Sequence, residues 1–191
     1  MTAASAVARA GGRVAVVEKA AELGGSSALS GGWVWTAPDP AVLVKESPRS
    51  DPALVSALCE GYERLIGWIE ASGAPVGDEA TVLEYGRGRP VGIPEYLEWC
   101  RDAVLSAGGT VRTRAQMFAL IVEDGAVAGA EVYERGEQVS YRAPWTLLAS
   151  GGFQAAPDLI ATYIHPHAPD MPLRANRASE GDGLRAALAA G

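Results

Sequence analysis

The chain has 191 residues, of which 48% are apolar and 20% are charged, a composition typical of a globular protein and not of a disordered one. Its 16 basic and 23 acidic residues give a net charge of −7, which argues against a general nucleic-acid-binding surface. Two cysteines, Cys59 and Cys100, are too few for a disulfide framework or a four-thiolate metal site, and no apolar run approaches the roughly 18 residues of a membrane-spanning helix.

The first part of the chain predicts a helix, a strand and a loop. Residues 2–9 are alanine-rich with a helical pattern, and the glycine pair 11–12 ends that helix. Residues 13–18 are an apolar run closed by Glu18, which is typical of a strand in a parallel sheet covered on both faces. Residues 22–36 are rich in glycine and serine and are expected to form a loop.

Two helices are expected next, separated by a loop at residues 74–92. Asp51, followed by a proline, is a favourable N-cap for a helix that ends before Gly73. The second helix is expected at residues 94–107, stopped by the glycine pair 108–109. Both cysteines lie in these helices and are expected to be buried. The face of the first helix predicted to be buried consists of Leu54, Leu58, Tyr62, Leu65 and Ile69.

The rest of the chain predicts strands and a closing helix. Asp124 and Gly125 are a strong hairpin signal, so a meander of antiparallel strands is expected around them. The apolar segment that leads into Ser150 predicts a further buried strand. The expected segments are strands at 110–113, 118–123, 127–134, 138–142 and 145–149, a proline-rich loop at 154–180 and a helix at 184–190.

The carboxylate of Glu18 is a candidate ribose ligand. In dinucleotide-binding units an acidic residue at the end of the second strand accepts hydrogen bonds from the ribose hydroxyls. A carboxylate also repels a 2′-phosphate, so FAD or NAD would fit better than NADP. An ordinary solvated glutamate is the simpler explanation for Glu18 taken alone.

Three further segments carry possible ligand-binding groups. The loop at 24–32 combines glycines, which permit close backbone approach, with serine hydroxyls and amides that can donate to phosphate. A linker is the alternative, but the following Trp33-Val34-Trp35 is atypical of one. The 150–152 segment follows an apolar run that is expected to be a strand, and open α/β sheets bind ligands at the carboxyl ends of their strands. A simple tight turn would have the same pattern. Asp182 would either cap the last helix or accept from a cofactor hydroxyl.

Taken together and in this order, segments 14–19, 24–32, 148–153 and 181–183 resemble the flavoprotein family of fumarate reductases, succinate dehydrogenase flavoprotein subunits and 3-ketosteroid dehydrogenases. The ketosteroid dehydrogenase branch is nearest, because of the Ser-Gly-Gly-Trp and Gly-Gly-Phe stretches. The resemblance covers essentially the whole chain. It implies an α/β fold, a Rossmann-like FAD-binding domain with a parallel sheet and a β-meander, and FAD as cofactor. It also implies oxidation or reduction of a carbon–carbon bond next to a carbonyl or carboxylate of a small-molecule substrate.

The resemblance assigns cofactor contacts residue by residue. Glu18 would bind the adenosine ribose with Lys19 beside it, Met117 would contact the adenine through its backbone, and Asp182 would bind near the ribityl chain. The residues implied to line the pyrophosphate, the flavin and the adenosine end are Gly25, Ser26, Ser27, Ser30, Gly31, Gly32, Ser150 and Gly151.

The sequence also departs from the family. The family begins with a strand and a GxGxxG motif, and residues 1–4 match the positions just after that motif. The family continues past residue 191 into a capping domain and a C-terminal flavin segment, which carry the substrate-binding and proton-donating residues. Residues 1–191 are therefore expected to be a partial, incomplete FAD-binding domain, truncated at both ends and without catalytic residues. Glu180 stands where the family commonly has threonine.

Two other function classes stay open. A catalytically inactive FAD-binding remnant is favoured by the missing pyrophosphate-binding helix start, whereas an NAD-binding dehydrogenase domain is disfavoured by the glycine–serine loop.

His165 and His167 are expected on the surface and not at a metal site. The N-terminus has no leader pattern, so a cytoplasmic location is expected. Nothing in the sequence predicts the oligomeric state. Arginines that could meet an anionic substrate, but are expected to be ordinary surface residues, are Arg87, Arg89, Arg174 and Arg177.

Overall fold

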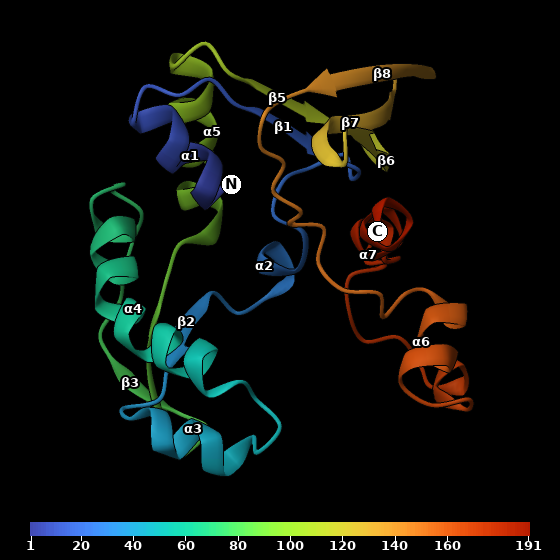
Figure 1. Cartoon of the computed structure of the whole chain (residues 1–191). Helices are drawn as coiled ribbons and strands as arrows, with labels where there is room; N and C mark the ends of the chain where they lie inside the picture. Colours follow the sequence, from blue (N-terminus) through green and yellow to red (C-terminus); the bar gives the residue numbers. More distant parts are fainter. The chain divides into compact units, whose positions relative to one another are not determined.

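The computed structural model describes all 191 residues and divides the chain into two compact units. Unit 1 consists of Met1–Leu29 and Arg101–Gly191, and unit 2 consists of Ser30–Cys100. Figure 1 labels the helices and strands in chain order. The chain leaves unit 1 after Leu29 and returns to it within helix α5 (Ile93–Ser106).

A two-stranded parallel sheet begins unit 1. Strand β1 (Ala15–Glu18) pairs with β5 (Thr110–Thr113) in parallel register. Helix α1 (Thr2–Arg9) precedes β1, and Gly11 and Gly108 follow α1 and α5 in the left-handed region, with φ of 83° and 74°. The predicted helix ends are therefore confirmed. The expectation that β1 is covered on both faces is wrong, because its residues are exposed or only half-buried in a sheet of two strands.

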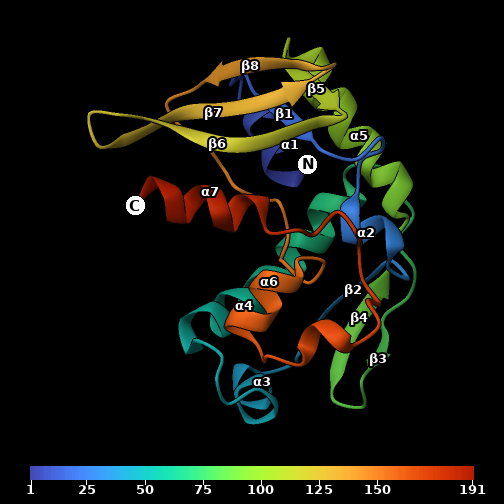
Figure 2. The same cartoon turned by 90° about the vertical axis from the view of Figure 1, so that its right-hand side faces the viewer.

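The predicted meander is confirmed in unit 1. Asp124 and Gly125 form the first turn with φ of 50° and 77°, the two positive values that a type I′ hairpin turn requires. Val132, in the central strand, is fully buried. Helix α7 (Asp182–Ala190) runs along the meander beside its first strand (Figure 2). The three antiparallel strands are β6 (Ala115–Glu123), β7 (Ala126–Glu134) and β8 (Glu137–Arg142).

The strand expected at residues 145–149 does not form. The chain between β8 and α6 (Pro157–Tyr163) is irregular (Figure 1), and the side chains of Trp145 and Leu147 are 90% and 71% exposed. An apolar run becomes a strand only when a neighbouring strand satisfies its backbone N–H and C=O groups, and β1 pairs with no strand other than β5. The segment expected as loop after it contains α6 and the short 3₁₀ helix η1 (Ala168–Asp170).

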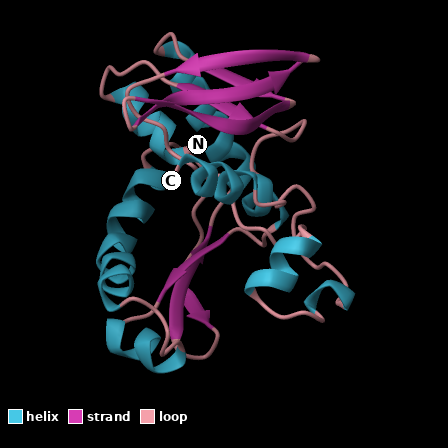
Figure 3. Cartoon of the chain, turned by 45° about the vertical axis from the view of Figure 1, so that its right-hand side comes forward, coloured by secondary structure: helices cyan, strands magenta, loops and turns pink.

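Unit 2 contains a small antiparallel sheet in a region that was predicted to be loop. Figure 3 shows its strands in magenta with helices in cyan. Gly88 lies so close to Trp35 that a Cβ on it would be 2.6 Å from the Trp35 Cβ, so the glycine makes room for the tryptophan and does not mark a loop. The strands, in spatial order, are β2 (Trp33–Thr36), β4 (Gly86–Pro90) and β3 (Ala80–Val82), and the helices are α3 (Pro40–Glu46) and α4 (Pro52–Glu70).

Helix α4 begins as predicted but buries a different face. The Asp51 carboxylate caps it by accepting hydrogen bonds from the amides of Ala53 (2.7 Å) and Leu54 (3.3 Å). Tyr62 is buried, with the guanidinium of Arg87 4.9 Å from its ring centre, so the face of α4 that carries Tyr62 is turned to the core. The residues that α4 buries are Val55, Tyr62, Ile66 and Ile69, whereas Leu54, Leu58 and Leu65 are exposed.

The two cysteines differ in burial. Cys100 in α5 is completely buried, as expected. Cys59 in α4 is only half-buried, because the face of the helix that carries it is not the one turned to the core.

Candidate functional site

The carboxyl end of β1 presents Glu18, the residue predicted to bind a ribose. Its side chain is half-buried, and its Oε1 accepts a hydrogen bond of 2.8 Å from the amide of Ala20. This bond holds the carboxylate at the end of the strand and leaves Oε2 to accept from another donor. The geometry suits a vicinal diol, which offers two hydroxyl donors.

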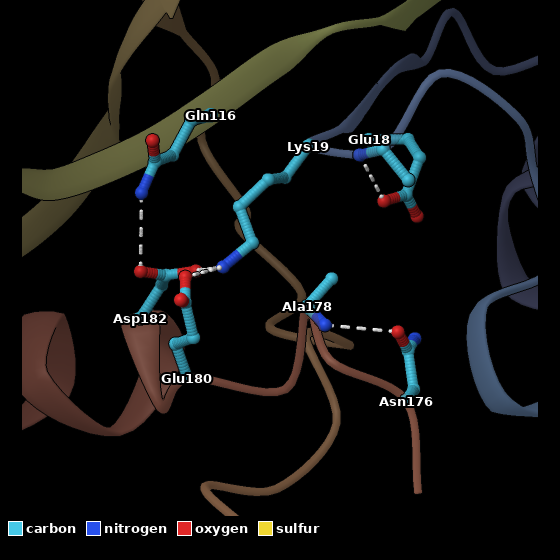
Figure 4. Close-up of polar contacts among 8 residues, drawn as sticks. Glu18, Lys19, Gln116, Asn176, Ala178, Glu180 and Asp182 are labelled. Carbon is cyan, nitrogen blue, oxygen red and sulfur yellow. Dashed lines mark hydrogen bonds and ion pairs between the residues drawn. The ribbon is translucent and has the colours of Figure 1, made fainter. Parts of the chain in front are cut away.

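Lys19 forms ion pairs with two acidic residues near the start of α7 (Figure 4). Its Nζ lies 2.5 Å from Oδ2 of Asp182 and 2.8 Å from Oε2 of Glu180. Burial by itself would lower the pKa of Lys19, but hydrogen bonds and charge attraction from Asp182 and Glu180 outweigh it and raise this pKa. Lys19 is therefore held charged between two carboxylates.

Asp182 does not cap its own helix. The N-cap of α7 is Gly181, which has φ of 79°, and no side chain accepts from the first amides of the helix. The Asp182 carboxylate instead meets Lys19 through Oδ2 and Gln116 through Oδ1, which accepts from the Gln116 amide at 3.3 Å. Of the two roles predicted for Asp182, the capping role is thus wrong.

The segment with Ser150 and Gly151 packs against the start of α7. Gly183 is so close to the Ser150 Oγ that a Cβ at position 183 would require the Ser150 side chain to move. Gly151 has φ of 76°, and a Cβ on it would lie 3.5 Å from Oγ of Ser179, which is buried. These contacts bring the 150–152 and 181–183 segments together, as a shared site requires.

The first glycines of the predicted phosphate loop lead into the short helix α2 (Gly25–Leu29). Gly24 and Gly25 have φ of 117° and 49°, values that other residues rarely adopt. Ser26 and Ser27 are exposed at the surface of unit 1. A Cβ on Gly25 would lie 3.5 Å from Nδ2 of Asn176, so the loop lies beside the 176–180 segment.

Met117 lies on β6, half-buried and opposite Val132, immediately before a register shift in the pairing of β6 with β7. Such an irregularity leaves backbone groups outside the regular ladder. Met117 directly follows Gln116, the residue that contacts Asp182.

Unit 2 holds the other three predicted residues, Ser30, Gly31 and Gly32. The Gly32 amide donates to Oγ of Ser30 at 3.1 Å, and a Cβ on Gly32 would lie 2.6 Å from the carbonyl oxygen of Val91. Close packing against Val91 and a φ of 75° account for a glycine at position 32 without any ligand.

Two residues at the site were not predicted. Gln116 contacts Asp182, and Asn176 accepts a 2.9 Å hydrogen bond from the Ala178 amide across a turn beside Gly25. Asn176 could have been found from the sequence, because asparagine side chains often accept a hydrogen bond from the backbone amide two residues later and so form a turn. Gln116 carried none, since its contact joins residues 66 positions apart.

Two of the arginine candidates, Arg87 and Arg89, are engaged within unit 2. Arg87 pairs with Glu63 at 2.7 Å and Glu79 at 3.0 Å, and Arg89 pairs with Glu70 at 3.3 Å. These pairs are internal to unit 2. No three histidine, cysteine, aspartate or glutamate side chains are grouped as metal ligands.

The side chains and glycines gathered in unit 1 are of the kinds that bind a dinucleotide. It offers a carboxylate with a remaining acceptor at Glu18, glycines in left-handed conformations at 24 and 25, exposed serine hydroxyls, and a second fixed carboxylate at Asp182. Carboxylates accept from sugar hydroxyls, whereas amides and hydroxyls donate to phosphate.

Comparisons with known proteins identify the same chemistry. A family model described as FAD binding domain matches residues 1–191. A probable fumarate reductase of Shewanella frigidimarina is 29% identical over 205 residues, which cover 92% of this chain and 34% of that protein. The chain therefore spans about a third of the length of this curated relative. No helix of the chain combines the length and apolar character needed to cross a membrane.

Two solved structures share the fold. A flavocytochrome c3 fumarate reductase in its open conformation superposes with a TM-score of 0.87 at 26% identity, over 98% of this chain and 38% of that one. The 3-ketosteroid-Δ4-(5α)-dehydrogenase of Rhodococcus jostii RHA1 superposes with a TM-score of 0.84 at 20% identity, over 99% of this chain and 51% of that one. The predicted α/β fold and the predicted flavoprotein resemblance are confirmed.

Proposed function

Because the chain belongs to the family of FAD binding domains, we propose that it forms the FAD-binding portion of an oxidoreductase acting on a carbon–carbon bond next to a carbonyl or carboxylate of a small molecule. FAD is the cofactor of this family, as the sequence predicts. The observation that carries the proposal is the family match over all 191 residues, together with Glu18 and Asp182 held as acceptors in one unit.

The reaction class is proposed from the relatives. One is named a fumarate reductase and another a ketosteroid dehydrogenase, and both names imply chemistry on a carbon–carbon bond beside an oxygen-bearing carbon. The chain spans only part of each, so residues 1–191 are proposed as a partial domain of a longer cytoplasmic flavoenzyme. Capping and C-terminal flavin segments would supply its substrate contacts.

The residues of unit 1 would hold the cofactor. Glu18 would accept from the adenosine ribose, and Asp182 would accept from a hydroxyl near the ribityl chain. Gly25, Ser26 and Ser27 would donate to the pyrophosphate, with Ser150 and Gly151 close to the adenosine end. When bound, FAD supplies hydride transfer at N5, while the protein binds and orients it.

The direct test is the visible spectrum of the purified chain, followed by titration of the colourless protein with FAD. Yellow protein, or flavin fluorescence quenched to saturation by added protein, is the expected result. Protein that binds NAD and not FAD would instead be a nicotinamide-dependent domain. Protein that binds neither would overturn the proposal.

A catalytically inactive FAD-binding remnant is the second candidate. It is favoured because two of the charged side chains gathered in unit 1 are already engaged: Lys19 is ion-paired, and Asp182 is engaged at both oxygens. Assays with fumarate and with a 3-ketosteroid separate the two candidates when the FAD-loaded longer protein is used, because it carries the segments that would contact the substrate and only an enzyme turns one of the two over.

A further inference from the structure

The cluster around Lys19 links elements that are far apart in the chain. Lys19 follows the last residue of β1, Gln116 lies on β6, and Glu180 and Asp182 flank the glycine that begins α7 (Figure 4). Its two ion pairs join residues 161 and 163 positions apart. The cluster therefore fastens the first turn of α7 to the ends of two strands.

Both oxygens of Asp182 are held by different neighbours. Oδ2 accepts from Lys19 at 2.5 Å, and Oδ1 accepts from Gln116 at 3.3 Å. A carboxylate bound at both ends cannot rotate freely, yet each oxygen keeps a lone pair that can accept another hydrogen bond. Asp182 is thus oriented before any ligand arrives, which lowers the entropy cost of binding.

Burial makes one of the two ion pairs the stronger. The side chains of Lys19 and Asp182 are each 21% exposed, whereas Glu180 is 54% exposed. A half-buried, charge-assisted hydrogen bond stabilises more than an exposed ion pair. We therefore expect the contact with Asp182 to fix the helix and that with Glu180 to contribute less.

We propose that Lys19 is a positioning residue of the cofactor site, which holds the Asp182 carboxylate and the first turn of α7 in place and does not itself contact FAD. The inference rests on the proposed FAD-binding function. It differs from the sequence prediction, in which Lys19 lies among the cofactor contacts. Gln116 supports the same carboxylate from β6 and is assigned the same role.

The geometry explains why one lysine faces two carboxylates. Without the ammonium group, Glu180 and Asp182 would be two like charges beside one helix start, and they would repel each other. Removing Lys19 therefore turns a stabilised carboxylate into a repelled one. Removing Glu180 as well would relieve that repulsion and restore part of the lost order.

The test compares Lys19→Met with Lys19→Arg in the full chain. Lys19→Met is expected to weaken FAD binding about tenfold, since a charge-assisted hydrogen bond of this kind is lost. Lys19→Arg keeps the charge and is expected to restore most of the affinity, and Lys19→Met combined with Glu180→Gln is expected to recover part of it. Arg142→Met, which breaks the exposed pair with Glu123, is the matched control and should leave the affinity unchanged.

A second readout does not depend on the cofactor. Hydrogen exchange of the α7 amides, measured without FAD, is expected to be faster in Lys19→Met than in the unaltered chain, and unchanged in Arg142→Met. Weakened FAD binding with unchanged exchange would mean that Lys19 contacts the cofactor directly, and it would overturn the positioning role. Unchanged exchange and unchanged affinity would overturn it as well.

A milder variant covers the case in which Lys19→Met does not fold. Gln116→Met removes the hydrogen bond to Oδ1 and keeps the side-chain length, and it should shift both readouts in the same direction by less. If the unaltered chain binds no FAD, the proposed function fails while the exchange measurement still decides whether Lys19 orders α7.

Discussion

At the scale of single residues, Glu18 combines a fixed position with unused bonding capacity. Oε1 is engaged by the Ala20 amide, and the other oxygen is left to accept from a ligand. A carboxylate restrained in this way loses little freedom on binding a ribose, and it disfavours a 2′-phosphate through charge repulsion.

Replacing Glu18 tests this arrangement. Glu18→Ala is expected to weaken FAD binding by about ten- to a hundredfold, because hydrogen bonds to a charged acceptor are lost. Flavin fluorescence quenching measures the change. Glu22→Ala, at an exposed glutamate four positions later, should bind FAD as the unaltered chain does. Equal affinity for all three proteins would contradict the role of Glu18.

Tyr62 supports a prediction about stability. Its ring is buried, and its hydroxyl has no hydrogen-bond partner, so the polar group is desolvated without compensation. Tyr62→Phe removes only that hydroxyl and is expected to raise the free energy of unfolding by up to about 1 kcal/mol. Urea unfolding at neutral pH measures this, and a loss of stability would show that the hydroxyl is bonded in solution.

The same residue predicts a pH dependence. Burial, and then the neighbouring Glu79, raise the pKa of Tyr62 above its ordinary value. The free energy of unfolding is therefore unaffected by this titration below the unfolded pKa of about 10. It falls as the pH rises through the higher folded pKa, because the unfolded chain loses the Tyr62 proton first. Between about pH 9 and about pH 12, Tyr62→Phe should lose less stability than Tyr133→Phe, because Tyr62→Phe has lost the buried titrating hydroxyl. Tyr133→Phe alters a half-exposed ring and keeps Tyr62. Identical losses would contradict the prediction.

At the scale of elements, the start of α7 depends on a glycine. Gly181 has φ of 79°, and a Cβ on it would overlap Leu159 and come within 2.9 Å of the Phe153 Cβ. Gly181→Ala is expected to lower the free energy of unfolding by about 1–3 kcal/mol, from backbone strain and overpacking together. Gly11→Ala, with φ of 83° and no atoms within 4 Å, isolates the strain alone. Equal losses in the two variants would show that packing at Gly181 contributes nothing.

Elements with local signals could be predicted from the sequence. Asp51 before a proline gave the start of α4, and Asp124 with Gly125 gave the first turn of the meander, because capping and turn geometry depend on neighbouring residues. Three predictions were wrong: the buried face of α4, the strand at 145–149, and the loop where unit 2 has a sheet. Each depends on which distant segment supplies a partner, and periodicity alone does not contain that information.

The candidate site divides in the same way. Glu18 and Asp182 were predicted because they stand at element ends in recognisable motifs. Gln116 was missed because an exposed glutamine on a strand has no pattern of its own, and it gains a role only where β6 passes α7. The sequence thus indicated the groups that we propose as ligand-binding better than the residues that hold them in place.

At the scale of the whole molecule, exposed apolar surface predicts self-association. Trp145 is 90% exposed in an irregular segment, and β1 has one edge without a partner strand. Open strand edges and exposed aromatic side chains favour pairing between chains. Trp145→Ser is expected to reduce association in sedimentation experiments and leave the urea midpoint unchanged. Leu54→Ser, on a helix whose backbone is already paired, should have less effect, and a fully monomeric unaltered chain would contradict the prediction.

The ion pair between Lys19 and Asp182 also has a consequence for the order of events during synthesis. A ribosome makes Asp182 163 residues after Lys19. A nascent chain that stops before α7 has Glu18 but no partner for Lys19 on that helix, so its cofactor groups are incomplete. Closing so long a loop is entropically costly and comes late in folding. Cofactor capture is therefore expected only after α7 has left the exit tunnel.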